Sequence, residues 1–265
     1  MLMWKMMIRD WKCENMYTKT EILSIAKRQL ALDYNCQLLD FEKEGNTITE
    51  NKLLEGRRIY ESDGCFLKII SIGGRAIICA DEKIRPWLEE KILKRDANWL
   101  FDYDKLRAID NKLREFGHEI DQMPHFYLPN PVTCDIKPIA PIKWFEKQEI
   151  LQFGDDSRFD EAFIFSENYP DVLGVAAFDG DIIMGMAGAS EDSKTLYQIG
   201  INVLPEYRGK GIGINLVALL KQELLKRGKV PFYGTAVSHI ISKNIAISAG
   251  FFPAWAEVYS KKLED

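Results

Sequence analysis

Short apolar runs in the second half of the chain predict strands. Residues 196–203 are rich in branched and aromatic side chains, and Pro205 closes the run, which predicts a strand. Two further apolar runs, residues 172–178 and 182–189, flank Asp179-Gly180-Asp181, a sequence typical of a hairpin turn. Residues 230–237 predict another strand.

A helix is predicted between the strands at 196–203 and 230–237. Apolar residues share one helical face from Gly213 to Leu224, and Lys226 and Arg227 precede Gly228, a good residue for ending a helix. The pattern therefore predicts a helix over about 210–227. A shorter helix is expected near residues 242–249.

The first half of the chain mixes both patterns. We expect a helix over 20–32 with Thr20 as its N-cap, a hairpin of residues 66–72 and 75–80 around Gly73-Gly74, and helices over 84–94 and 103–116. Half of the chain's 10 prolines then cluster between Pro124 and Pro141. This favours an N-terminal α+β domain (1–127), a proline-rich linker (128–142) and a second domain (143–265).

The segment Tyr207-Arg208-Gly209-Lys210-Gly211-Ile212-Gly213 places three glycines on alternate residues between the strand and the long helix. The first N–H groups of a helix lack partners inside the helix, and glycines let an anion approach them closely. Arg208 and Lys210 add positive charge, so the segment favours a phosphate site over a ligand-free glycine-rich loop. Its spacing differs from that of a P-loop.

At these residues the chain resembles the GNAT superfamily of acyl-CoA-dependent N-acyltransferases. The resemblance rests on residues 203–213, which end in Pro-Glu-Tyr-Arg-Gly-Lys-Gly-Ile-Gly, and on Gly250-Phe251, and it extends over about 144–260. It implies an α/β (α+β) fold with a mixed sheet, flanked by helices and splayed open between the strands at 196–203 and 230–237. The pantetheine arm of the acyl donor would lie in that gap.

The resemblance also implies the chemistry: an acetyl or short acyl group passes from acetyl-CoA to a primary amine by direct attack, and no metal takes part. The backbone N–H of Val203 would polarise the thioester, and the residues of the glycine segment would hold the pyrophosphate. The implied donor-site residues are Ile201, Val203, Arg208, Gly209, Lys210, Gly211, Ile212, Gly213, Ser242 and Asn244.

The acid and base of the reaction are less well marked. Many family members carry a Tyr shortly before the Gly-Phe pair, but no Tyr lies between Val237 and Gly250 here. His239, Ser238 and Tyr197 are therefore the catalytic candidates, and His239 suits either role because histidine titrates near neutral pH. The structural alternatives are a helix-entry residue for His239, a packed strand aromatic for Tyr197 and a helix cap for Ser242.

Composition narrows the setting. The net charge of −5 gives no support for nucleic-acid binding and leaves a cationic amine acceptor, on a small molecule or a protein, plausible. Five scattered cysteines, no apolar stretch of membrane-spanning length and a charged N-terminus indicate a cytoplasmic protein that does not enter membranes. Met16 is an alternative start, and a homodimer stays open.

Two further expectations concern function. The missing Tyr supports a rival hypothesis, in which the protein is a catalytically inactive acyl-CoA sensor or regulatory module; transfer to oxygen is a third option. The N-terminal domain is expected to lie beside the acceptor end of the second domain and to help shape the substrate pocket, because clefts between domains are favoured sites.

Overall fold

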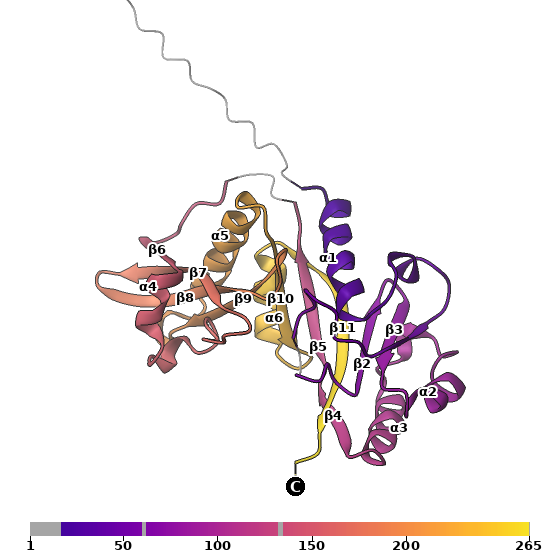
Figure 1. Ribbon diagram of the computed structural model, residues 1–265. Helices are drawn as coiled ribbons and strands as arrows, with labels where there is room; N and C mark the ends of the chain where they lie inside the picture. The colour runs from indigo at the N-terminus through magenta and orange to yellow at the C-terminus, as the bar shows by residue number, and fades with distance from the viewer. Residues whose placement is uncertain (1–16, 60–61, 132–134, 265) are drawn as a thin grey trace, which may run out of the picture.

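The computed structural model describes residues 17–59, 62–131 and 135–264. Within these ranges eleven strands form one mixed sheet in the order β1-β3-β2-β11-β5-β10-β9-β8-β7-β6, and β4 pairs with β11 outside this path (Figure 1). The strands are β1 Thr47–Glu50, β2 Leu67–Ile72, β3 Arg75–Ala80, β4 His118–Gln122, β5 Pro124–Pro129, β6 Ile142–Glu146, β7 Asp171–Asp179, β8 Ile182–Glu191, β9 Leu196–Val203, β10 Val230–Ala236 and β11 Phe251–Lys262.

The α-helices cover both faces of this sheet. They are α1 Lys19–Asp33, α2 Arg85–Lys91, α3 Tyr103–Arg114, α4 Lys147–Ile150, α5 Ile212–Lys226 and α6 Ile240–Ser248. None of the helices in the described ranges has the length and apolar character needed to cross a membrane.

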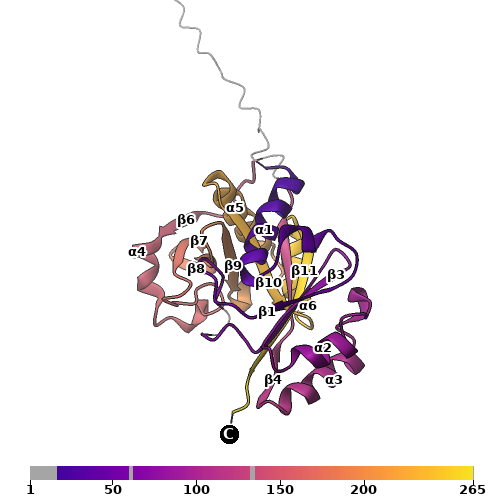
Figure 2. The same ribbon diagram turned by 45° about the vertical axis from the view of Figure 1, so that its right-hand side comes forward.

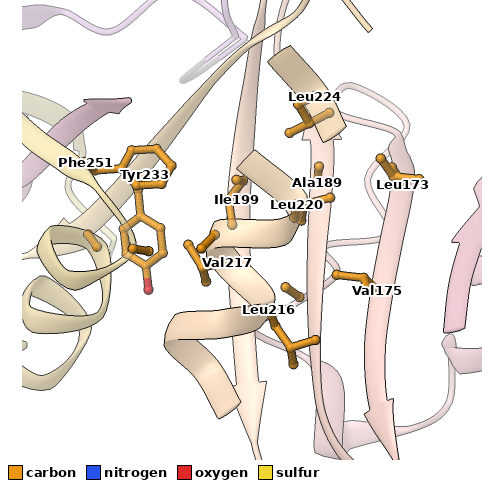
Figure 3. Packing of buried hydrophobic residues seen from close by; sticks show 14 of the residues in the cluster. Leu173, Val175, Ala189, Ile199, Leu216, Val217, Leu220, Leu224, Tyr233 and Phe251 are labelled. Carbon is orange, nitrogen blue, oxygen red and sulfur yellow. The ribbon is translucent and has the colours of Figure 1, made fainter. Parts of the chain in front are cut away.

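Helix α5 packs on one face of β7, β8 and β9. Figure 3 shows Leu216, Val217, Leu220 and Leu224 of α5 directed toward the strands, where they meet side chains such as Val175 and Ile199 in one apolar core. Because side chains alternate along a strand, the neighbouring residues of β7 and β8 face the other way. That opposite face carries a separate core with Phe159, Phe163, Ala176 and Met186, over which α4 lies.

Helix α1 covers the middle of the sheet and contacts β5 and β10 (Figure 2). Ile22, Ala26 and Leu30 of α1 form a core with Phe232 and Trp255. Phe232 belongs to this core, whereas its neighbour Tyr233 belongs to the core under α5. Helix α1 therefore lies on the face opposite to α5.

The sheet opens between β9 and β10, as the resemblance implies. The two strands run parallel and pair only over three residues each, ending at Gln198 and Phe232. Beyond this point residues 233–236 of β10 pair with β5 instead, while residues 199–203 of β9 keep only β8 as a neighbour. The gap therefore begins after Gln198 and widens toward Val203.

Several predicted elements differ from the structure. Helix α1 begins at Lys19 with Thr18 as its N-cap, so Thr20 as the cap was wrong. Helix α5 begins at Ile212, two residues later than predicted, because Gly211 adopts a left-handed conformation at the N-cap. Strands β1, β4, β5 and β6 had no counterpart in the prediction.

The region expected to be a linker also begins differently. Leu128 and Pro129 end β5, which lies between β10 and β11 in the sheet. Strand β11, from the end of the chain, pairs with β2, β4 and β5, all from the first 130 residues. The division into 1–127, 128–142 and 143–265 stays a prediction, while the sheet runs through both halves without a break.

Some sequence expectations lie outside the described residues. These concern the N-terminus up to Met16, Cys13 and Cys134. Among the described residues, Cys36 and Cys79 carry free thiols, and Cys65 is buried.

Candidate functional site

The glycine segment forms the turn that leads into α5. A short 3₁₀ turn, Pro205–Tyr207, follows β9, and α5 then begins with Gly211 as its N-cap and no side chain bonded to the first turn. The first bond of the helix joins the N–H of Asn215 to the carbonyl of Gly211. The N–H groups of residues 212–214 precede it, and at a helix start such groups point outward at the positive end of the helix dipole.

Two glycines keep the space in front of this helix start open. Gly209 and Gly211 have φ of +74° and +80°, a conformation that side chains disfavour. A Cβ built on Gly209 would meet nothing within 4 Å, and one on Gly211 would meet only Ile139, at 3.7 Å. Gly213 has another role, since a Cβ there would lie 3.1 Å from the side chain of Val203. It lets the helix start lie close against the end of β9.

The basic residues of the segment lie at the same open side. Arg208 is exposed and donates from Nε to the carbonyl of Val203 at 3.0 Å, which fixes the guanidinium beside the strand end. Lys210 is exposed, with Nζ 4.9 Å from the ring centre of Tyr207. Two exposed cations thus lie within four residues of a row of free helix-start N–H groups, an arrangement that suits a diphosphate.

Backbone groups of β9 face the gap in the sheet. The N–H of Leu204 donates to Met184 of β8 at 2.9 Å. Because successive N–H groups of a strand point to opposite sides, those of Val203 and Ile201 point away from β8, toward the gap. These are the groups that the resemblance assigns to the amides and thioester of the donor.

The other two expected donor-site residues lie on α6. Ser242 is buried inside the helix, and its Oγ lies 2.9 Å from Oη of Tyr233. The N-cap of α6 is His239, so Ser242 as a cap was wrong. Asn244 is exposed on the same helix.

The catalytic candidates fall into two places. His239 and Ser238 are exposed between β10 and α6, beyond the end of β10. Tyr197 is buried in the core under α5, at the closed end of the β9–β10 pair, and Lys229 Nζ lies 5.0 Å from its ring centre. The structure therefore places Tyr197 as a packed aromatic, apart from the other two residues.

A cavity of about 490 Å³ opens on the face of the sheet opposite to α5. Its wall includes Gln198 and Gly234, at the point where the sheet splays, and Thr235 of β10. Arg58 and Phe126 line it from the first half of the chain. Residues of both halves therefore line this cavity, while a role of the N-terminal domain in the substrate pocket stays a prediction.

The same cavity holds a carboxylate that the sequence analysis did not single out. Asp192 follows β8, is half-buried, and accepts a hydrogen bond from Ser190 Oγ at 2.7 Å. Burial raises the pKa of Asp192 to about 6, although the Ser190 hydroxyl and Arg58 act in the opposite direction. A carboxylate in a turn carries no sequence signal for burial, which explains why it was missed.

A comparison with protein-family models matches the part of the chain that contains the glycine segment. Residues 137–247 match the model described as the acetyltransferase (GNAT) family. No curated protein matches the sequence.

Solved structures that match part or most of this chain include two putative acetyltransferases and one acetyltransferase-like protein. A putative GNAT-family acetyltransferase from Novosphingobium aromaticivorans shares 16% identity over 56% of this chain and 69% of its own, with a TM-score of 0.42. A GCN5-related N-acetyltransferase-like protein from Streptococcus suis shares 15% identity over 91% of this chain and 99% of its own (TM-score 0.45). A putative acetyltransferase from Salmonella typhimurium, solved with acetyl-CoA, shares 15% identity over 47% and 94% (TM-score 0.35). Because the family model matches them, residues 137–247 of this chain form a domain of the acetyltransferase (GNAT) family.

Proposed function

We propose that the protein is an N-acetyltransferase that moves an acetyl or short acyl group from acetyl-CoA to a primary amine by direct attack. The observation that carries this proposal is the turn before α5, where two left-handed glycines and two exposed cations surround the unbonded helix start next to the gap between β9 and β10. The family match over residues 137–247 supports it. A cytoplasmic location and action without a metal belong to the same proposal.

Each part of the donor has a matching group in this chain. The diphosphate would bind the N–H groups of residues 212–214, with Arg208 and Lys210 adding charge. The pantetheine amides would pair with the edge of β9, including Ile201. Val203 lies against Gly213 at the diphosphate end of β9, so its N–H would pair with the pantetheine arm, and the thioester oxygen would face the N–H of Ile199, nearer the start of the gap. A donor of this kind lowers the barrier by about 3 kcal/mol through the charge that develops on that oxygen.

The first experiment measures donor binding. Gly211→Ala fills the space before the helix and strains a left-handed position, so we expect acetyl-CoA binding, followed by calorimetry, to weaken at least about tenfold. Gly180→Ala is the matched control, because Gly180 also has a positive φ (+58°) with open space around it but lies in the β7–β8 turn. Equal binding by the two variants, or no heat with wild-type protein and any form of coenzyme A, would overturn the proposal.

The second experiment separates an enzyme from a sensor. The exposed His239 and the buried Tyr197 leave the candidates of the sequence analysis without a shared site, which is the observation that favours a sensor. Release of free thiol from acetyl-CoA is measured with a panel of primary amines. An acyltransferase releases thiol in proportion to the amine, whereas a sensor binds the donor and shows no amine-dependent release.

A further inference from the structure

The cavity and the proposed donor site lie on opposite faces of the sheet and meet at its gap. The side chains of Tyr197 and Ile199 pack in the core under α5, so Gln198, between them, faces the other way. A Cβ built on Gly234 would lie 3.5 Å from Gln198 Nε2, so this amide lies beside β10 at the start of the gap. A molecule in the cavity can therefore approach the gap from the side away from α5.

Asp192 is held on the wall of this cavity by the sheet itself. Ser190 is buried and pairs in register with Gln198 of β9, so both side chains lie on the same face. Ser190 Oγ donates to Asp192 Oδ1 at 2.7 Å, which turns the carboxylate back toward that face. Asp192, just after β8, and Gln198 of β9 thus line one cavity.

Apolar side chains form another part of the cavity wall. Phe126 and Ile164 supply apolar surface, and Tyr169 adds an aromatic ring.

We propose that Asp192 is the general base of the transfer, and that the acceptor is a small molecule whose primary ammonium group binds Asp192 while its apolar body packs against Phe126 and Tyr169. The proposal rests on the proposed function. A cavity of about 490 Å³ is in the size range of small-molecule sites, which favours such an acceptor over a lysine on a protein surface.

The proton balance is simple. Asp192 takes one proton from the ammonium and leaves a neutral amine. The amine nitrogen forms a bond to the thioester carbonyl carbon, the carbon–sulfur bond breaks, and the sulfur leaves with its electron pair. The nitrogen loses its second proton to the thiolate, so the products are an amide and a thiol, and Asp192 returns its proton to solvent.

The groups around Asp192 set its protonation. Burial disfavours the carboxylate most, and Asp33 of α1 and Asp171 of β7 add to this effect. The Ser190 hydroxyl and Arg58 favour the carboxylate but do not compensate for burial. Burial also raises the pKa of Tyr169, which faces Asp192, to about 12, so that phenol keeps its proton at neutral pH. Asp192 is therefore a carboxylate above about pH 6, where a base is needed.

The test compares Asp192→Asn with wild-type protein, and Asp181→Asn, an exposed residue of the β7–β8 turn, is the matched control. Thiol release from acetyl-CoA is followed between pH 5 and 9 with phenethylamine, n-butylamine, a lysine-containing peptide and O-methylhydroxylamine. Calorimetry with coenzyme A runs in parallel. Phenethylamine is the expected acceptor, and Asp192→Asn should lower its kcat/KM by about 100-fold or more with donor binding unchanged. Asp181→Asn should match wild type.

Two readouts distinguish a base from a residue that only supports the structure. O-methylhydroxylamine is uncharged at neutral pH and needs no base to remove an ammonium proton. Asp192→Asn should therefore lower kcat/KM for this acceptor by less than about tenfold. Ser190→Ala removes a hydrogen bond that favours the carboxylate, so the acidic limb of the pH profile should move to higher pH.

The failures are separable. Absence of coenzyme A binding by wild-type protein, or binding without thiol release for any amine, would reject the proposed function. Thiol release by wild-type protein together with a kcat/KM of Asp192→Asn within about threefold of wild type would reject Asp192 as the base while the proposed function stands. Release with the lysine-containing peptide alone would reject the small-molecule acceptor.

Discussion

Asp192 illustrates how one residue can be placed at a cost to folding. Its pKa rises from 3.8 to about 6 because the folded protein disfavours the carboxylate. The unfolded chain therefore gains more than the folded protein from ionisation, and stability falls as the pH rises from about 4 to about 6. Above pH 6 the loss is constant, and the two pKa values set its upper bound at about 3 kcal/mol.

Replacing this residue should therefore raise stability while it removes activity. We expect Asp192→Asn to unfold at a higher urea concentration than wild type at pH 8, by about 1 to 2 kcal/mol in the free energy of unfolding, and to match wild type near pH 4. Asp181→Asn should show no such difference at either pH. A variant less stable than wild type at pH 8 would mean that the carboxylate is stabilised in the folded protein.

Helix α1 begins with a side-chain cap that stabilises the whole element. Thr18 Oγ1 accepts from the N–H of Glu21 at 3.2 Å, and Glu21 accepts from the N–H of Thr18 at 2.7 Å, which makes a reciprocal capping box. We expect Thr18→Ala to lower the free energy of unfolding by about 1 kcal/mol. Thr20→Ala, two residues later on the exposed side, should be neutral or slightly stabilising because alanine favours helices.

Thermal or urea unfolding of the two variants checks this prediction. If Thr18→Ala and Thr20→Ala lowered the free energy of unfolding equally, the helix end would be frayed and the cap would contribute little. The helix packs Ile22, Ala26 and Leu30 into the core, so the cap acts on an element whose position is fixed by packing.

Sequence patterns predicted elements best where both ends carry a marker. Strand β9 was predicted to the residue because its run of branched and aromatic residues follows the polar residues 191–195 and Pro205 closes it. Strand β5 was missed because Pro124 and Pro129 resemble a linker, yet they lie at its two ends, where a strand tolerates proline. Strands β1 and β4 were missed because their residues are polar and only partly buried.

The site shows the same limit. A local motif predicted the turn before α5, since the glycines and cations are neighbours in sequence. The cavity joins Arg58, Phe126, Asp192 and Gly234, which are far apart along the chain, so only the fold brings them together. The role of each residue in the donor site stays a prediction until binding is measured.

At the scale of the whole molecule, the continuous sheet predicts that the two halves depend on each other. Strand β5 lies between β10 and β11, and Phe232 and Trp255 pack against residues of α1. A fragment of residues 143–265 would lose β5 and β2 as partners of its strands and expose this apolar surface. We expect the fragment to show no cooperative thermal transition, whereas the full chain unfolds cooperatively.

Circular dichroism and calorimetry with coenzyme A check the fragment. A cooperative transition together with donor binding by residues 143–265 would show instead that the predicted second domain folds alone. The full chain, prepared in parallel, is the control for both measurements.

The position of β11 has a consequence for synthesis on the ribosome. The N–H of Leu67 in β2 bonds to Ser260 of β11, 193 residues later, so β2 and β5 receive their shared neighbour only when the last residues emerge. At ordinary elongation rates, the wait after β5 is on the order of ten seconds. During that time the nascent chain carries two bare strand edges, which are sites for chaperones or aggregation. A premature stop before Phe251 would make this exposure permanent.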